Sequence, residues 1–204
     1  MATDPCRIAV LVSGGGTNLQ ALIDARGRGE IPHGEISLVI SNKEGAYALE
    51  RAAKAGIPNL VITKAACGGD QAAFEEALLA QLAACEIDLI VLAGFMSILS
   101  KRFTDAYEKR ILNVHPSLIP SFCGEGFYGL RVHRAALERG VKVTGATVHF
   151  VNEIPDGGEI ILQKAVAIEE GDTPEILQRR VMEQAEWIIL PRAVEIVSEK
   201  IANN

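Results

Sequence analysis

Short apolar runs alternate with longer amphipathic stretches through the first half of the chain. The runs are rich in Val, Ile and Leu and cover residues 7–13, 35–41, 59–62 and 88–93. Such runs are typical of strands buried on both faces of a parallel sheet. The stretches between them predict helices at residues 18–29 and 45–56 and around the apolar stripe of Phe74, Leu78, Leu79 and Leu82. Regular alternation of this kind predicts a doubly wound α/β sheet.

The second half of the chain ends differently. A helix at residues 100–109, a strand at 111–115 and a helix at 130–139 continue the alternation, but two strands at 143–150 and 160–168 then follow each other directly. Parallel strands need a longer crossover connection, so we expect these two strands to be antiparallel.

The C-terminal segment predicts one long helix. Thr173 is suited to cap its first turn, and Pro191 is expected to kink it. No repeat or low-complexity linker divides the chain. We therefore expect a single α/β domain over residues 1–204, with a mostly parallel sheet, antiparallel strands near the C-terminus and a long C-terminal helix.

A glycine turn follows the first strand at once. Gly14, Gly15 and Gly16 allow a sharp turn and a close approach of a ligand, and Thr17 or Asn18 is suited to cap the helix that follows. A strand, a glycine turn and a helix N-terminus together form an anion site, because free N–H groups and the helix dipole point at one place. A simple tight turn is the alternative, although three successive glycines are costly without a ligand.

Two nucleotide motifs do not fit this turn. A dinucleotide fingerprint would need a third glycine where Leu19 stands and an acid after the second strand, where the sequence has Asn42 and Lys43. A P-loop would need Gly-Lys-Ser/Thr after a four-residue gap, which is missing. A small phosphorylated ligand remains.

Candidate chemistry is concentrated in the strand at residues 111–115. Asn113 and His115 alternate with apolar neighbours, so both side chains lie on one face of the strand and could serve one reaction centre. The same pattern also suits a semi-buried histidine before a turn and an asparagine at a strand end. The two other central histidines have simpler interpretations: His133 is a surface or capping histidine, and His149 is structural.

Three loops complete the set of candidates. Residues 96–99 follow a buried strand and either pack on their own helix or form a wall for a flat apolar ligand. The glycine-containing aromatic loop 121–128 is expected to be mobile. Asp156 precedes two glycines, and an ordinary Asp-Gly turn is the commonest interpretation of that pattern.

Composition excludes several classes of function. The chain has 20 basic and 26 acidic residues, a net charge of −6, without a Lys/Arg cluster that could neutralise a row of phosphates, so we expect no nucleic-acid partner. The N-terminus lacks a basic start and a long apolar region, and no segment is suited to a membrane, which favours a cytoplasmic location. The cysteines are scattered without metal-ligand spacing, so we expect no metal site and no disulfide framework.

Five segments together resemble the glycinamide ribonucleotide (GAR) transformylase family, the folate-dependent formyltransferases of purine synthesis. They are SGGGTNLQ, LAGFMSILS, NVHPSLIPSF, GATVHFV and DGG followed by ILQ, in this order and at family-like spacing over nearly the whole chain. Each segment is weak alone, whereas five in register are specific. The resemblance implies a formyltransferase fold with a Rossmann-like N-terminal half, residues 1–100 binding the ribonucleotide phosphate and residues 101–204 binding folate and carrying the catalytic groups.

The resemblance also implies roles for individual residues. It implies a catalytic trio of Asn113, His115 and Asp156. It implies a substrate site made of Gly16, Thr17, Asn18, Gly94, Pro116 and Glu186, with the last at the glycinamide end. It implies a folate site made of Met96, Ser97, Ile98, Leu99, Asn113, Val151, Asn152, Glu153 and Asp156. Three departures stand out: Ser97 and Gln71 replace basic residues associated with the folate glutamate tail, and the sequence before Trp187 carries an extra residue.

The implied reaction is transfer of formyl from 10-formyltetrahydrofolate to the amine of GAR through a tetrahedral intermediate. The amine is the nucleophile, so the protein must position two substrates and stabilise an oxyanion. Asn113 and a protonated His115 can donate to that oxygen, while Asp156 is expected to keep His115 protonated toward neutral pH and to accept the amine proton. Cys123 as a covalent formyl carrier is possible but unneeded.

Two alternatives remain open at this point. One is a different formyl-folate enzyme, a hydrolase or a transferase to methionyl-tRNA, although the glycine turn favours a small phosphorylated acceptor and the acidic composition disfavours tRNA. The other is a non-catalytic nucleotide or folate sensor with the same fold. The expected assembly is a monomer or a homodimer, and the sequence does not choose between them.

Overall fold

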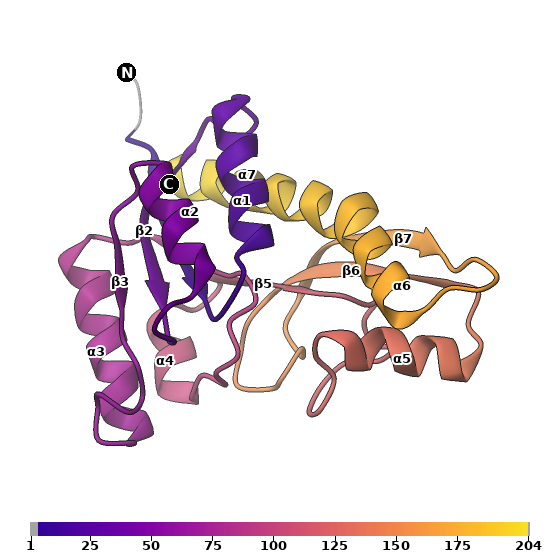
Figure 1. Ribbon diagram of the computed structural model, residues 1–204. Helices are drawn as coiled ribbons and strands as arrows, with labels where there is room; N and C mark the ends of the chain where they lie inside the picture. Colours follow the sequence, from indigo (N-terminus) through magenta and orange to yellow (C-terminus); the bar gives the residue numbers. More distant parts are fainter. Residues whose placement is uncertain (1–3, 204) are drawn as a thin grey trace.

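One seven-stranded sheet forms the centre of the molecule in the computed structural model, which describes residues 4–203 (Figure 1). The strands are β1 (Cys6–Val12), β2 (Gly34–Ser41), β3 (Asn59–Val61), β4 (Leu89–Leu92), β5 (Ile111–His115), β6 (Val143–Phe150) and β7 (Ile160–Ala167). Their order is β3-β2-β1-β4-β5-β6-β7. The first five strands are parallel, whereas β6 pairs antiparallel with both β5 and β7. The predicted sheet type is confirmed.

Helices cover both faces of the sheet. They are α1 (Thr17–Gly27), α2 (Tyr47–Lys54), α3 (Gln71–Ala84), α4 (Lys101–Ala106), α5 (Leu130–Arg139), α6 (Pro174–Val181) and α7 (Trp187–Ala202), with a π-helical turn η1 (Met182–Glu186) between the last two. One apolar core joins the sheet to α1, α2, α6 and α7, and a second joins the opposite face to α3 and α4. The expected stripe of α3 lies in the second core, although Leu79 is only partly buried.

The C-terminal helix is less regular than the sequence predicts. Thr173 caps α6 as expected, since its side chain accepts a hydrogen bond from the N–H of Ile176. The irregular turn, however, is η1, which lies before Pro191, and Pro191 itself lies inside α7. A π-turn accommodates one extra residue in a helix, so it provides a place for the additional residue noted before Trp187.

The connections after β1 and β4 leave the sheet on opposite sides, which makes the gap between these neighbouring strands a topological switch point. Ligands of open α/β sheets bind at such a point, beside the carboxyl ends of the strands. The two connections meet here, because the N–H of Met96 donates to the Ser13 hydroxyl at 2.8 Å.

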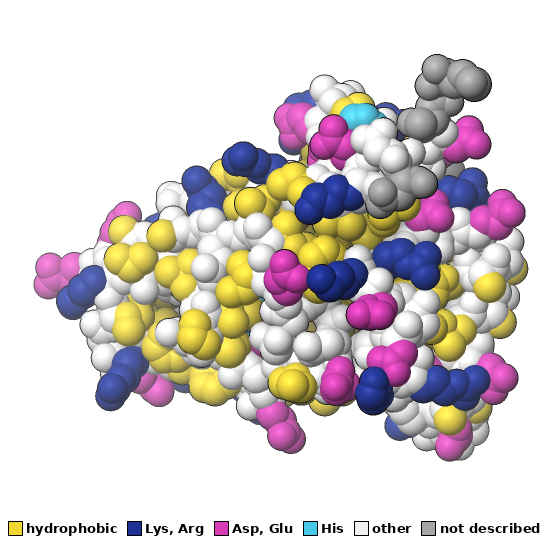
Figure 2. Space-filling view, turned by 180° about the vertical axis from the view of Figure 1, so that it is seen from behind, with side chains coloured by type: hydrophobic (Ala, Val, Ile, Leu, Met, Phe, Trp, Pro, Cys, Tyr) yellow, Lys and Arg dark blue, Asp and Glu magenta, His cyan; other side chains and the backbone are white. Residues whose placement is uncertain are grey.

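The surface carries a mixed charge pattern. On the face shown in Figure 2, Lys and Arg side chains lie among Asp and Glu side chains, with hydrophobic side chains between them. This face therefore does not present one continuous positive surface. Within residues 4–203, no helix is both long and apolar enough to cross a membrane.

Candidate active site

The glycine turn forms one end of the candidate site. Helix α1 begins directly after Gly16, and no side chain caps it, so the prediction of a cap at Thr17 or Asn18 is wrong. Gly16 has a φ of 70°, and a Cβ there would lie 2.6 Å from the Cβ of Ala48, so both backbone and packing require glycine. The first N–H groups of an α-helix have no partner within the helix, and without a side-chain cap they remain available to an anion.

A carboxylate from the other end of the chain lies beside this turn. The side-chain amide of Asn18, which lies in the first turn of α1 rather than at its cap, donates to Glu186 at 2.8 Å. Glu186 is only 6% exposed, and burial raises the pKa of its carboxyl group while the Asn18 hydrogen bond opposes that shift. The structure thus brings together two residues that the family resemblance assigned to the substrate.

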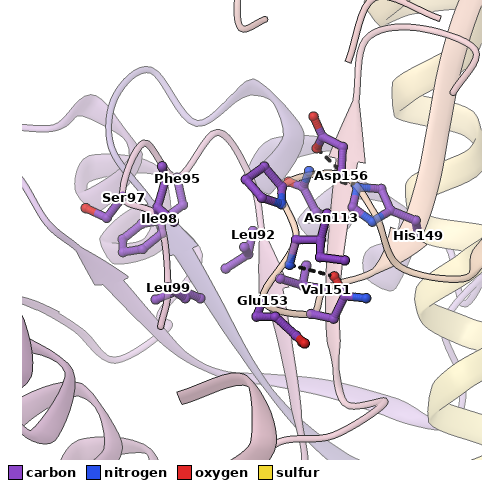
Figure 3. Close-up of a pocket in the computed structure, with 13 residues that line it drawn as sticks. Leu92, Phe95, Ser97, Ile98, Leu99, Asn113, His149, Val151, Glu153 and Asp156 are labelled. Carbon is purple, nitrogen blue, oxygen red and sulfur yellow. Dashed lines mark hydrogen bonds and ion pairs between the residues drawn. The ribbon is translucent and has the colours of Figure 1, made fainter. Parts of the chain in front are cut away.

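A pocket opens between the loop after β4 and the connection from β6 to β7 (Figure 3). Its lining residues are Leu92, Phe95, Ser97, Ile98, Leu99, Asn113, His149, Val151, Asn152, Glu153, Ile154, Pro155 and Asp156. These include almost all residues expected at the folate site. Met96 is the exception: it is 53% exposed and does not line the pocket.

Hydrogen bonds hold the wall of this pocket. Ser97 accepts from the Asn42 amide at 2.8 Å, and the carbonyl of Ile98 accepts from the Gln71 amide at 3.1 Å. The buried Glu75 accepts from both Gln71 and the N–H of Ser100. The two positions at which basic residues were associated with the folate tail, Ser97 and Gln71, are thus neutral here and fasten the pocket wall to the domain.

The three residues of the expected catalytic trio lie together. The His115 Nδ1 atom is 3.4 Å from Asp156 Oδ2, and Asn113, two residues before His115 on β5, lines the pocket with Asp156. Loop residues bind both members of the pair: His115 Nε2 is 2.9 Å from the Phe122 carbonyl, and the Gly124 N–H donates to Asp156 at 2.8 Å. Asp156 is therefore more than an ordinary Asp-Gly turn residue.

A fourth side chain joins the trio. His149, which the sequence suggested to be structural, lines the pocket, with Nε2 at 3.2 Å from Asn113 Nδ2 and at 3.5 Å from Asp156 Oδ1. Figure 3 shows these three side chains pointing toward one another. The feature that places His149 in the site is strand register, because antiparallel pairing sets His149 directly opposite Asn113 on the same face of the sheet.

Burial changes the titration expected for His115. This side chain is 4% exposed, and burial lowers the pKa of His115 more than the Asp156 charge and the Phe122 carbonyl raise it. The expectation that Asp156 keeps His115 protonated toward neutral pH is therefore wrong for the unliganded chain. For Asp156, burial alone would raise the pKa, but the His149 hydrogen bond, the His115 charge and the Gly124 N–H together lower it.

His133 corrects a second expectation. It is 0% exposed inside α5 rather than a surface or capping residue, and neither ring nitrogen has a hydrogen-bond partner within residues 4–203. Burial, with a smaller contribution from His115, lowers the pKa of His133 to about 4. Helical spacing was an available signal, because His133 lies on the same face of α5 as the buried Val132 and Ala136.

The remaining candidates lie at the edges of the site. Gly94, with a φ of 71°, turns the chain after β4, and Pro116 directly follows β5, so both sit at carboxyl ends of strands. Burial raises the pKa of the Cys123 thiol, and the nearby Asp156 charge raises it further, which keeps the sulfur protonated and poorly nucleophilic. Among the residues described, no group of three or more His, Cys, Asp or Glu is arranged to hold a metal ion.

Comparisons with known proteins agree on one family. A family model described as formyl transferase matches residues 6–194. Phosphoribosylglycinamide formyltransferase of Haemophilus influenzae is 44% identical over 193 residues, covering 95% of this chain and 87% of that protein. The crystal structure of glycinamide ribonucleotide transformylase 1 from Symbiobacterium toebii superposes with a TM-score of 0.89 at 46% identity, covering 96% of this chain and 89% of that one.

A longer relative shows the same similarity over part of its length. The trifunctional purine biosynthetic protein adenosine-3 of Gallus gallus is 46% identical over 196 residues. The match covers 96% of this chain but only 19% of that protein. The chain thus spans about a fifth of the first curated relatives that it matches.

Proposed function

The chain belongs to the formyl transferase family, and on that premise we propose that it transfers a formyl group from 10-formyltetrahydrofolate to the amine of GAR, a step of de novo purine synthesis. The observation that carries the proposal is the convergence of Asn113, His115 and Asp156 at a pocket beside the carboxyl ends of β4 and β5. The products are formyl-GAR and tetrahydrofolate.

The two substrates have separate places in this proposal. The phosphate of the ribonucleotide binds the N–H groups at Gly16, Thr17 and Asn18, and Glu186 receives the glycinamide end. The pterin occupies the pocket, whose apolar wall includes Leu92, Phe95, Ile98, Leu99 and Val151. Gly94 and Pro116, which follow β4 and β5, complete the substrate site in this proposal.

Stabilisation of the developing oxyanion is the first task of the trio. Asn113 offers a side-chain N–H, and His115 Nε2 exchanges the Phe122 carbonyl for the formyl oxygen. Both ring nitrogens of His115 face acceptors, an arrangement that suits the protonated ring although burial opposes it. Negative charge on the formyl oxygen adds to that of Asp156, so the reaction itself favours protonation of His115.

Proton removal is the second task. The attacking amine must lose a proton, and Asp156 accepts it directly or through a water molecule. The lowered pKa of Asp156 keeps the carboxylate ionised at neutral pH and ready for this role. The amine is itself the nucleophile, so no protein nucleophile is required.

An acceptor panel tests the proposal. Purified protein is incubated with 10-formyltetrahydrofolate and, in separate reactions, GAR, methionyl-tRNA or water alone, and formylated product and free formate are measured. We expect rapid formylation of GAR and much slower reaction with the other acceptors. Formate release without GAR would instead indicate a hydrolase, and binding of both ligands without turnover would indicate a sensor.

A further inference from the structure

The hydrogen bonds of His149 define which of its nitrogens carries a proton. His149 is 1% exposed on β6, and its Nδ1 atom lies 2.8 Å from the carbonyl oxygen of Phe150. A carbonyl can only accept, so Nδ1 must carry the hydrogen. In the neutral ring, Nε2 then has a lone pair and acts as an acceptor.

Asn113 supplies the donor for that lone pair. Its Nδ2 atom lies 3.2 Å from His149 Nε2, and an amide nitrogen can only donate. This bond uses one of the two N–H groups of Nδ2 and fixes the orientation of the amide. With the amide turned over, Oδ1 of Asn113 would face the lone pair of Nε2, which is unfavourable. His149 is therefore the neighbour that distinguishes the two orientations of Asn113.

Asp156 competes for the same nitrogen. Its Oδ1 atom is 3.5 Å from His149 Nε2, longer than the Asn113 contact. A proton on Nε2 would strengthen the contact with Asp156 and repel the Asn113 N–H group. The two partners thus require opposite states of His149. A hydrogen bond from Nε2 to Asp156 is the contribution of His149 to the lowered pKa of Asp156, but this contact is 3.5 Å long, whereas Asn113 lies at 3.2 Å. The shorter Asn113 distance corresponds to the neutral ring, in which the His115 charge and the Gly124 N–H still lower the pKa of Asp156.

We infer that His149 is a positioning residue: in its neutral Nδ1–H form it accepts from Asn113 and thereby directs the second Asn113 N–H toward the formyl oxygen. The inference rests on the proposed function, because it assigns a purpose to the Asn113 orientation. His149 acts through Asn113 and does not exchange a proton with the substrate. Antiparallel pairing of β5 and β6 makes this possible, since it sets the two residues opposite each other.

The ring tautomer can be measured without any substitution. In ¹⁵N NMR spectra of the parent protein with labelled histidine, we expect His149 to be neutral and protonated at Nδ1 at pH 7. A ring protonated at Nε2, alone or together with Nδ1, would overturn the inference. This measurement does not depend on turnover.

Two substitutions separate the role of each nitrogen. Glutamine can place an acceptor near the Nε2 position, whereas asparagine can place a donor near the Nδ1 position. We expect His149→Gln to keep kcat within about fivefold of the parent, and His149→Asn to lower kcat by about 100-fold, the scale for loss of one oxyanion donor. The KM values for both substrates should change little. A merely structural role for the Phe150 hydrogen bond predicts the opposite order, which would overturn the inference.

A double variant tests the path through Asn113. Once Asn113→Ala has removed the oriented amide, adding His149→Asn should slow formyl transfer no further. Multiplicative losses would contradict a role through Asn113. A parent protein that formylates no acceptor would refute the proposed function, whereas an active parent with an equally active His149→Asn variant would refute only the role of His149.

Discussion

The buried His133 should make the fold sensitive to acid. Its ring is enclosed, both nitrogens lack a partner among the described residues, and burial lowers its pKa to about 4. In the unfolded chain the pKa of a histidine is about 6.5. Because the unfolded chain takes up this proton at a higher pH, the contribution to stability is complete above about pH 6.5 and is lost progressively as the pH falls from there to about 4.

The size of this effect follows from the two pKa values. A difference of roughly 2.5 pKa units corresponds to about 2 kcal/mol of stability lost by pH 5 and about 3 kcal/mol by pH 4. Total stabilities of domains are only about 5–15 kcal/mol, so such a loss is easily measured. His133→Leu removes both the titrating ring and the two unpaired nitrogens.

Urea denaturation at pH 7, 5 and 4 measures the effect. The parent should lose about 2 kcal/mol more than His133→Leu between pH 7 and 5. His33→Gln is the matched control: the Glu195 carboxylate at 2.6 Å raises the pKa of His33, so its contribution is lost as pH rises and its removal cannot reduce the acid loss. Parallel pH dependence in the parent and His133→Leu would refute the reasoning.

Three further predictions concern the proposed site. Asp156→Asn should lower the rate of single-turnover formyl transfer at least ~100-fold with little change in substrate binding, and adding His115→Ala should lower that rate little further. A double variant whose loss of rate is the product of the two single losses, or an Asp156→Asn variant with a near-parental rate, would contradict a coupled pair. Ile98→Asp, at a pocket residue that is 70% exposed, should weaken folate about tenfold and leave GAR binding intact, as titrations of both ligands would check. Gly15→Ala should fold normally, because an added Cβ there meets nothing within 4 Å, and it should raise the KM for GAR but not that for the folate. Gly16→Ala should instead lower the melting temperature through the contact with Ala48. Equal melting temperatures for the two variants would contradict this reasoning.

The sequence predicted the layered architecture well because local patterns determine it. Continuous apolar runs marked the buried parallel strands, and the short connection after residue 150 correctly indicated an antiparallel pair. Helix boundaries were less secure. Residues 45–56 were expected to be helical, whereas α2 covers Tyr47–Lys54, because the flanking glycines end the helix.

The site was predictable only in part. Asn113 and His115 share a strand, so their proximity follows from local geometry. Asp156 and Glu186 were assigned through the family resemblance, because a contact such as that between Asn18 and Glu186 joins residues far apart in the sequence. His149 was expected to be only structural, because cross-strand register does not follow from composition. His115 was expected to stay protonated, because its burial does not follow from the sequence.

The π-turn Met182–Glu186 has a consequence for how the chain tolerates a change of length. An α-helix turns by about 100° per residue, so one inserted residue would rotate everything after it and move the buried side of α7 away from the sheet. The wider turn absorbs such an insertion locally, and Ile189, Leu190 and Ala193 remain in the core. Removing Glu183 should therefore restore an ordinary helical pitch while Glu186 keeps its place beside Asn18. The helix can thus differ by one residue at this point without displacing either the apolar face of α7 or the carboxylate.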